Sequence, residues 1–169
     1  MKKIIIIVLV SLFFKDPLNA QGAKSVYFEL GGPGLASFNF DMRFGDKEDG
    51  LGGRVGIGGF SISSNDGFGG RDRVGVVFIP VGINYLLGKD GKNYFELGAG
   101  VTPVIASSSF NDDNFSTTFG HIIFGYRLQP RDGGFTFRAF ISPVFGSFGF
   151  IPYYGGVSFG YKFGRAKGK

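Results

Sequence analysis

The chain is built from stretches of about ten residues in which large apolar residues alternate with small or polar ones. Across residues 77–85 every odd-numbered residue is large and apolar, and the even-numbered positions end in Gly82 and Asn84. A period of two gives a β-sheet with one apolar face and one mixed face. About eight such stretches occur, and no convincing helical period is seen after residue 20. The pattern therefore predicts an all-β fold.

The alternation predicts eight strands, over residues 24–32, 35–44, 51–61, 73–86, 93–105, 117–128, 134–145 and 153–163. The connections after the second, fourth and sixth strands are short and charged or Gly-rich, which is typical of tight hairpin turns. Those after the third and fifth strands are longer, and we expect loops over residues 62–72 and 107–116. The connections after the first and seventh strands, residues 33–34 and 146–152, are short.

The two faces of the predicted strands differ in charge. The apolar faces, to which Phe38, Ile79 and Phe137 belong, carry no charged residue. The opposite faces carry many glycines and the charged or titratable residues Glu29, Asp41, Arg43, Arg54, Glu96, His121, Arg127, Arg138 and Lys162. This segregation is what a membrane barrel requires, with an uncharged surface towards lipid and a polar interior.

Two features modify this simple pattern. Pro80 lies in the middle of a predicted strand, where it lacks the N–H that a ladder needs, so we expect a bulge or a local break there. Tryptophan is absent, so an aromatic girdle at the membrane interfaces has to come from Phe and from tyrosines at positions 85, 94, 126, 153 and 161.

The N-terminus has the three parts of a secretory signal peptide: basic residues, an apolar run over residues 4–14, and a small residue, Ala20, at the expected cleavage site. Eleven apolar residues are too few for a spanning helix, which needs about 20. We therefore divide the chain into a signal peptide (1–20), one β-barrel domain (21–163) and a short basic tail (164–169). Of the net charge of +5, the signal peptide carries +2, and the dispersed remainder does not indicate nucleic-acid binding.

The predicted last strand resembles the C-terminal assembly signal of the small eight-stranded outer-membrane β-barrels of Gram-negative bacteria. The resemblance rests on Tyr154, Gly156, Phe159 and Tyr161, and it extends over about residues 24–163 through the strand count and the alternation. It implies an antiparallel up-and-down transmembrane barrel in the outer membrane, in contact with lipid and inserted by the barrel-assembly machinery through those four residues. One departure is that the family usually ends on the last aromatic residue, whereas here a basic tail follows.

The interior charges allow two interpretations. An eight-stranded barrel is almost filled by its own side chains, so buried charges have to pair with one another. The first interpretation is a non-enzymatic barrel with a structural or surface-interaction role, whose lumen is plugged by ion pairs. The second is a narrow pore for small, possibly anionic solutes, since five basic residues face three acidic ones.

Residue types that support enzymatic or metal chemistry are scarce. Cysteine is absent and His121 is the only histidine, with no serine beside it to form a nucleophile–base pair. We therefore expect no enzymatic activity, no metal site and no cofactor. A third alternative is a soluble, exported lipocalin-like barrel that binds an apolar ligand, which would place the apolar face inside. The glycines on the charged face argue against it, because small residues are useful in a crowded lumen and not on a solvated surface.

Overall fold

The computed structural model describes residues 22–65, 71–108 and 114–164. The predicted signal peptide and residues 165–169 of the tail lie outside this part of the chain. The described residues form a short 3-10 turn, η1 (Gly32–Gly34), and eleven strands. The strands are β1 (Lys24–Gly31), β2 (Ala36–Arg43), β3 (Gly50–Asn65), β4 (Arg71–Phe78), β5 (Val81–Leu87), β6 (Asn93–Ser108), β7 (Asn114–Leu128), β8 (Gly134–Ile141), β9 (Val144–Gly146), β10 (Gly149–Ile151) and β11 (Gly155–Lys162).

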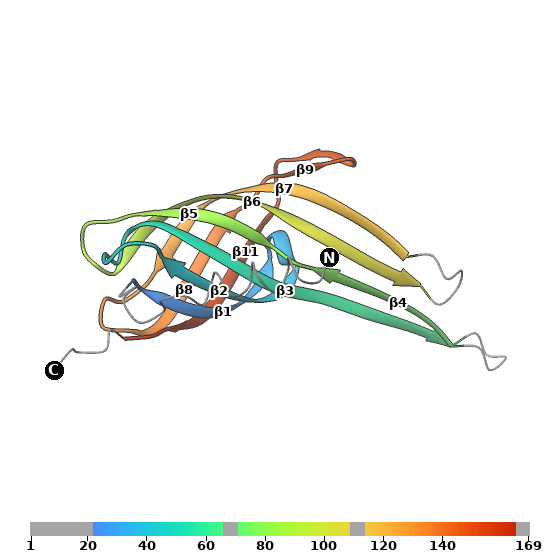
Figure 1. Cartoon of the computed structure of the whole chain (residues 1–169), viewed down its shortest axis with the longest axis horizontal. Coiled ribbons are helices and arrows are strands. Elements are labelled where there is room, and N and C mark those ends of the chain that lie inside the picture. The colour runs from blue at the N-terminus through green and yellow to red at the C-terminus, as the bar shows by residue number, and fades with distance from the viewer. Residues whose placement is uncertain (1–21, 66–70, 109–113, 165–169) are drawn as a thin grey trace, which may run out of the picture.

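All strand pairings are antiparallel, and the sheet closes on itself because β1 pairs with both β2 and β11 (Figure 1). The wall has eight strands, since β4 and β5 together form one wall strand, β9 continues the line of β8, and β10, which pairs with β9, is not part of the wall. This confirms the predicted eight-stranded up-and-down barrel. Over the described ranges, no helix is long and apolar enough to cross a membrane.

The wall strand that contains Pro80 is interrupted, as the sequence predicts. β4 ends at Phe78 and β5 begins at Val81, but β3 pairs with both strands in one continuous register. No extra residue is inserted, so the feature is a local break and not a bulge. Pro80 has no N–H to donate, but its carbonyl oxygen accepts a hydrogen bond from the Gly56 N–H at 2.8 Å. A second break, at Pro143, separates β8 from β9.

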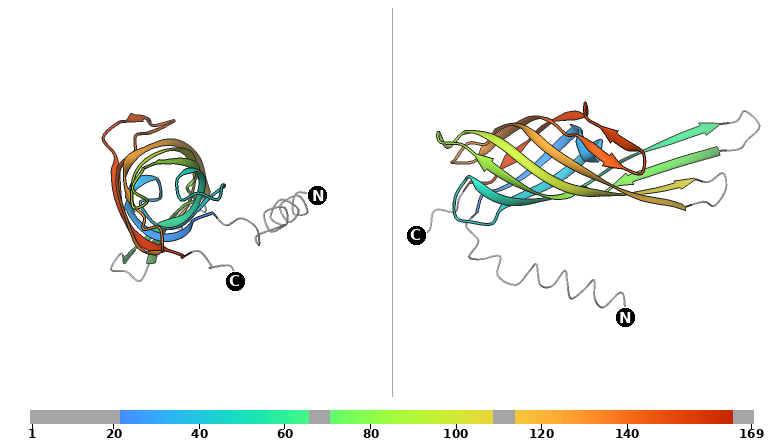
Figure 2. Two further views of the ribbon diagram at one scale, coloured as in Figure 1. Left: turned by 90° about the vertical axis from the view of Figure 1, so that its left-hand side faces the viewer. Right: turned by 90° about the horizontal axis from the view of Figure 1, so that it is seen from above.

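The described parts of the two predicted long loops are strand, so their predicted bounds were wrong. β3 and β4 continue to Asn65 and from Arg71, while β6 and β7 continue to Ser108 and from Asn114. Both pairs form hairpins that extend well beyond the rest of the wall at one end of the barrel (Figures 1 and 2). The physical reason is that the backbone groups of these segments are paired, because β4 pairs with both β3 and β6, and β6 pairs with β7. Likewise, the connection predicted over residues 146–152 contains part of the β9–β10 hairpin.

The barrel has two ends that differ in construction. We call the end with the two long hairpins the hairpin end. The opposite end holds the connections β2–β3, β5–β6 and β7–β8 together with the end of β11, and we call it the turn end (Figure 2).

The apolar residues face outward and the charged residues face inward. Phe38 is 69% exposed, whereas Arg54 is 3% and Glu96 is 1% exposed. A lipocalin-like barrel needs the reverse arrangement, so the structure contradicts that alternative. Of the tyrosines proposed for an aromatic girdle, those at positions 85, 126, 153 and 161 are exposed, but Tyr94 is buried on the inner face. Tyr94 pairs with the inward-facing Arg127 on the neighbouring strand, and paired residues point to the same face of a sheet.

Inward glycines leave room for large inward neighbours. A Cβ atom at Gly160 would lie 2.2 Å from the Val26 carbonyl oxygen and 2.4 Å from the Cβ of Tyr27. A Cβ atom at Gly56 would lie 2.2 Å from Oδ1 of Asn39. Glycine at these positions therefore lets Tyr27 and Asn39 occupy the lumen.

Candidate functional site

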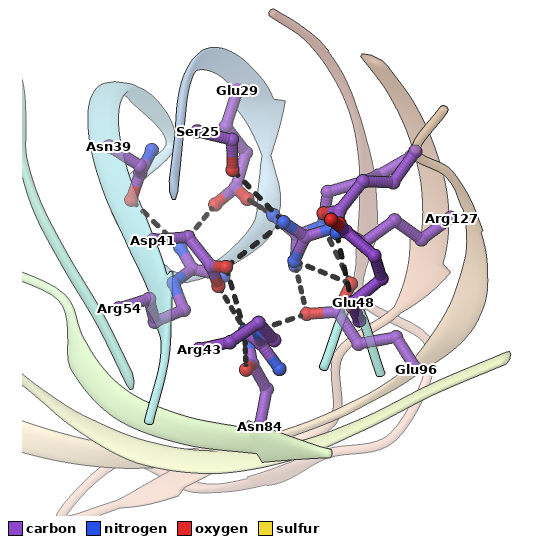
Figure 3. Close-up of polar contacts among 12 residues, drawn as sticks. Ser25, Glu29, Asn39, Asp41, Arg43, Glu48, Arg54, Asn84, Glu96 and Arg127 are labelled. Atoms are coloured by element: carbon purple, nitrogen blue, oxygen red, sulfur yellow. Dashed lines mark hydrogen bonds and ion pairs between the residues drawn. The ribbon is translucent and has the colours of Figure 1, made fainter. Parts of the chain in front are cut away.

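The candidate site is the polar interior of the barrel, where charged side chains from seven wall strands converge; Figure 3 shows a large part of it. The period of two along each strand places them on the same side of the wall. None of the nine predicted lumen residues is more than 3% exposed. Eight of them take part in ion pairs, and His121 does not.

Glu29 and Glu96 are joined by Arg138. Its guanidinium group donates to both oxygens of Glu96, from Nε at 2.8 Å and from Nη2 at 2.7 Å, and from Nη1 to Glu29 at 3.1 Å. Arg54 completes the group by donating to the other oxygen of Glu29 at 3.0 Å. Two-pronged arginine–carboxylate contacts are among the stronger polar interactions in proteins, so Arg138 fixes the relative positions of β1, β6 and β8.

Asp41 forms the centre of a second group, closer to the turn end. It accepts hydrogen bonds from Arg43 at 2.7 Å and from Arg127 at 2.9 Å. Asn84 connects the two groups, because its amide nitrogen donates to Asp41 at 2.5 Å and to Glu96 at 3.1 Å. Arg43 also donates to the amide oxygen of Asn84. The interior charges therefore form one continuous network.

Two aromatic rings, those of Tyr27 and Phe140, contact the arginines of this network. The Arg138 guanidinium carbon lies 4.6 Å from the centroid of the Tyr27 ring and 5.1 Å from that of Phe140. The Arg54 guanidinium carbon lies 5.9 Å from the same Tyr27 ring. Cations gain stabilisation over aromatic faces when water is excluded, and all four of these side chains are buried.

At the turn end, the β2–β3 connection closes over the interior. Glu48 is 6% exposed and pairs with Lys162 of β11 at 2.6 Å. The Lys162 ammonium group also donates to the carbonyl oxygens of Pro130 and Arg131, at 3.0 and 2.5 Å. Gln129 donates to the Glu48 carbonyl oxygen at 3.3 Å. Glu48 is thus a lumen residue that the sequence placed in an exposed turn, because alternation says nothing about how a turn folds back.

At the hairpin end, the turn η1 bends into the barrel. All three of its residues are buried, and Gly32 has a φ of 66° that favours glycine. A Cβ atom at Gly32 would lie 2.8 Å from Glu29 Oε1 and 2.8 Å from the Phe140 ring. The view along the barrel in Figure 2 shows this connection and the β2–β3 connection inside the ring of strands. The ion pairs are therefore covered from both ends.

His121 lies apart from the ion pairs. Its Nδ1 is 3.3 Å from the Thr102 hydroxyl oxygen, and its backbone pairs with Val144 of β9. Among the described residues, no group of three or more His, Cys, Asp or Glu side chains is positioned to hold a metal ion.

The structure also shows polar partners that the sequence analysis did not single out. Asn84, Asn39 and Ser25 contact the charged residues from inward positions. The alternation placed all three on the polar face, but an uncharged side chain gives no signal of its role without its partners.

The four residues of the predicted assembly signal do not form a cluster. Phe159 and Tyr161 face outward from β11, and Phe159 packs against Phe137 with ring centroids 5.4 Å apart. Gly156 lies on the inner face, where a Cβ atom would meet the Leu30 carbonyl oxygen at 2.7 Å. Tyr154 is half-buried in the connection before β11.

Two solved structures have the same fold. The N-terminal β-barrel domain of OprF from Pseudomonas aeruginosa matches with a TM-score of 0.55 and 13% identity, over 84% of this chain and 96% of that chain. Ail, the attachment invasion locus protein of Yersinia pestis, matches in its complex with the heparin analogue sucrose octasulfate, with a TM-score of 0.51 and 17% identity, over 84% of this chain and 99% of that chain. No protein-family model and no curated protein matches the sequence. The chain therefore has the fold of the eight-stranded outer-membrane β-barrels.

Proposed function

We propose that this protein is a non-enzymatic outer-membrane barrel with a structural or surface-interaction role, and that its lumen is plugged. The observation that carries the proposal is the buried network that links Glu29, Asp41 and Glu96 to four arginines, with a connection folded over each end. Such a network holds the wall in one register, because each charge left unpaired in the interior would be costly.

The charge balance favours the plug over an anion-selective pore. The nine predicted residues include five basic and three acidic side chains, and the structure adds Glu48, which is paired with Lys162. The excess is therefore one positive charge, and every one of these cations contacts an acidic side chain. A passing anion would have to displace carboxylates from their arginines.

The surroundings of His121 support a role without catalysis. A general base needs a nucleophile within hydrogen-bond reach, and the partner of the His121 ring is the buried hydroxyl of Thr102. That pair lies inside the wall, without a route for substrate on the turn-end side, where the ion pairs fill the lumen.

The surface-interaction role would involve the hairpin end. The Ail structure contains a heparin analogue, but the sequence here does not suggest a polyanion-binding surface. Residues 59–77 carry two arginines and two aspartates, and residues 103–119 carry two aspartates and no basic residue. The few charges at this end have both signs and form no basic cluster, so a polyanion is not the partner that we expect.

Two further partners belong to the proposal. Outer-membrane lipid would contact the apolar outer face, and the barrel-assembly machinery would use Tyr154, Gly156, Phe159 and Tyr161 during insertion. The outward position of Phe159 and Tyr161 is compatible with that role, because a machine acting from outside the wall can reach them.

The test combines location with conductance. A membrane barrel pellets with the outer membrane, resists extraction by sodium carbonate and shifts its gel mobility on boiling. In planar bilayers the plugged barrel shows no steps. Small anion-selective steps that change when Arg138 is neutralised would instead establish the pore, and recovery in the periplasmic extract would contradict the membrane location.

A further inference from the structure

The two long hairpins form a sheet that projects beyond the wall. The polarity of its two faces is the opposite of that in the wall: the inner face is the apolar one. This projecting sheet consists of residues 59–62 of β3, 74–78 of β4, 104–107 of β6 and 115–119 of β7. Its strands pair in that order.

The strand register fixes which face is the inner one. Arg54 faces the lumen, and the pairing of β3 runs without a shift from Val55–Val81 through Gly58–Phe78 to Ile62–Val74. Because side chains alternate, the even-numbered residues of β3 and β4 remain on the lumen side. The same pairing carries this face across β6 and β7. The inner face of the projecting sheet is therefore apolar except for Thr117, and it includes Phe60, Ile62, Val74, Val76, Val104 and Phe115.

The outer face of the same strands is mostly polar or small. It carries Ser61, Gly75, Ser107, Ser116 and Thr118, and its apolar residues, Val77 and Ile105, pair with each other at the base of the sheet, next to the wall. In the wall below, the outer face is apolar and the inner face is charged. Serine and threonine side chains that face lipid are unfavourable in hydrocarbon, so this segment stands beyond the apolar band of the wall. Its inner face is nevertheless apolar.

The apolar inner face is open. Phe60 is 42%, Ile62 is 63% and Phe115 is 62% exposed. Contiguous exposed apolar surface usually marks a binding site. The wall across from this sheet is lower, because β1 ends at Gly31 and β2 begins at Ala36. In the described chain, residues 59–65 of β3 pair with β4 but with no strand at their other edge.

The low rim is itself apolar and leads to the lipid-facing surface. Leu30, Leu35 and Phe38 are 47%, 40% and 69% exposed along it. Below the rim, the outer faces of β11, β1, β2 and β3 form an apolar groove of about 690 Å³, lined by residues such as Phe28, Phe38 and Ile57. An apolar surface therefore runs from the groove over the rim towards the inner face of the projecting sheet.

We propose that the inner face of the projecting sheet binds an acyl chain of a membrane lipid, which reaches it over the rim formed by Leu30 and Leu35. This inference rests on the membrane location proposed above. The occupant is a hydrocarbon chain and not a charged partner, because the described side chains of the inner face are uncharged and all but Thr117 are apolar, and because the surface is continuous with the one that contacts lipid.

The test uses tryptophan reporters, because the native chain contains no tryptophan. The full-length variants Phe60→Trp and Phe115→Trp report on the inner face. Ser61→Trp is the matched control on the outer face of the same strand, and Phe38→Trp reports on the lipid-facing wall. Each is reconstituted into vesicles of dioleoylphosphatidylcholine, or of the same lipid brominated on its acyl chains, which quenches tryptophan on contact. The gel shift on boiling shows that each variant is folded.

We expect Phe60→Trp and Phe115→Trp to be quenched at least half as much as Phe38→Trp, and Ser61→Trp to be hardly quenched. If Phe38→Trp is quenched but the two inner reporters are not, the inference is wrong and the membrane location stands. A blue-shifted but unquenched Phe60→Trp would mean that protein covers the face, which also overturns the inference. Equal quenching at positions 60 and 61 would mean that the whole projecting sheet lies in the membrane, which would overturn the inference as well. Absence of quenching at Phe38→Trp would refute the proposed function itself.

Discussion

At the scale of single residues, Arg138 has the largest structural role because it contacts both Glu29 and Glu96 and lies over the Tyr27 ring. Replacing Arg138 by Met leaves two buried carboxylates with fewer cations. We expect the free energy of unfolding to fall by about 3–5 kcal/mol, as is usual when one partner of a buried ion pair is removed. Urea unfolding in lipid vesicles, followed by the change in gel mobility, measures the effect.

The matched control replaces an exposed lysine that lies outside the interior network. Lys89 lies exposed in the β5–β6 connection, and Lys89→Met should change stability by less than about 0.5 kcal/mol. Equal stability of Arg138→Met and Lys89→Met would contradict the view that the interior network holds the wall together.

A second residue-scale prediction concerns Asp90, in the exposed connection between β5 and β6. Its carboxylate accepts hydrogen bonds from the Asn93 side chain and from the Asn93 and Lys92 backbone N–H groups, which lowers the pKa of Asp90 to about 2. A lowered pKa in the folded state means that the contribution to turn stability is present above the unfolded pKa and is lost as pH falls through about 2.

Removing the largest cause of this shift should move the titration. In Asn93→Ala we expect the pKa of Asp90 to rise towards its ordinary value, because the side-chain hydrogen bond is lost. A carbon-detected NMR titration of the Asp90 carboxyl group, compared between the parent and the variant, measures this. An unchanged pKa would show that the side chain of Asn93 has no part in the shift.

At the scale of elements, the close approach of neighbouring strands depends on glycine at some positions and not at others. Gly160 has no room for a Cβ atom, whereas a Cβ atom at Gly75 would have Ser107 Oγ at 3.6 Å as its nearest neighbour. We expect Gly160→Ala to destabilise the barrel by about 1–3 kcal/mol through overpacking, and Gly75→Ala to leave stability nearly unchanged. The urea midpoints of unfolding of the two variants measure this difference. Equal midpoints would contradict the close approach of β1 and β11 at Gly160.

The elements also show what alternation can and cannot predict. Strand number, strand direction and the break at Pro80 follow from residue pattern alone, since proline lacks the N–H that the ladder uses. The far end of β3 does not follow, because its apolar residues change from odd positions up to Ile57 to even positions from Phe60 onward. That change of phase resembles the end of a strand, whereas in the structure the strand continues and only the chemistry of its faces reverses.

The interior site was predictable to a similar degree. The charged residues of the strands could be placed inside from their parity, because a one-residue offset separates the two faces of a strand. The separate contacts could not, since the partners Asp41 and Arg127 are far apart in sequence and meet only after the barrel closes. Glu48 and Gly32 were not predicted because turns that fold into the lumen carry no periodic signal.

At the scale of the whole molecule, the account depends on which side of the wall contacts hydrocarbon. A nitroxide scan along β2 tests this most directly, because the chain contains no native cysteine that would interfere with labelling. In lipid vesicles, labels at Phe38 and Phe40 should collide often with oxygen and rarely with a water-soluble nickel complex, while a label at Lys89 should show the reverse. If the nickel complex reaches positions 38 and 40 as readily as position 89, the apolar face lies in water and the membrane barrel is refuted.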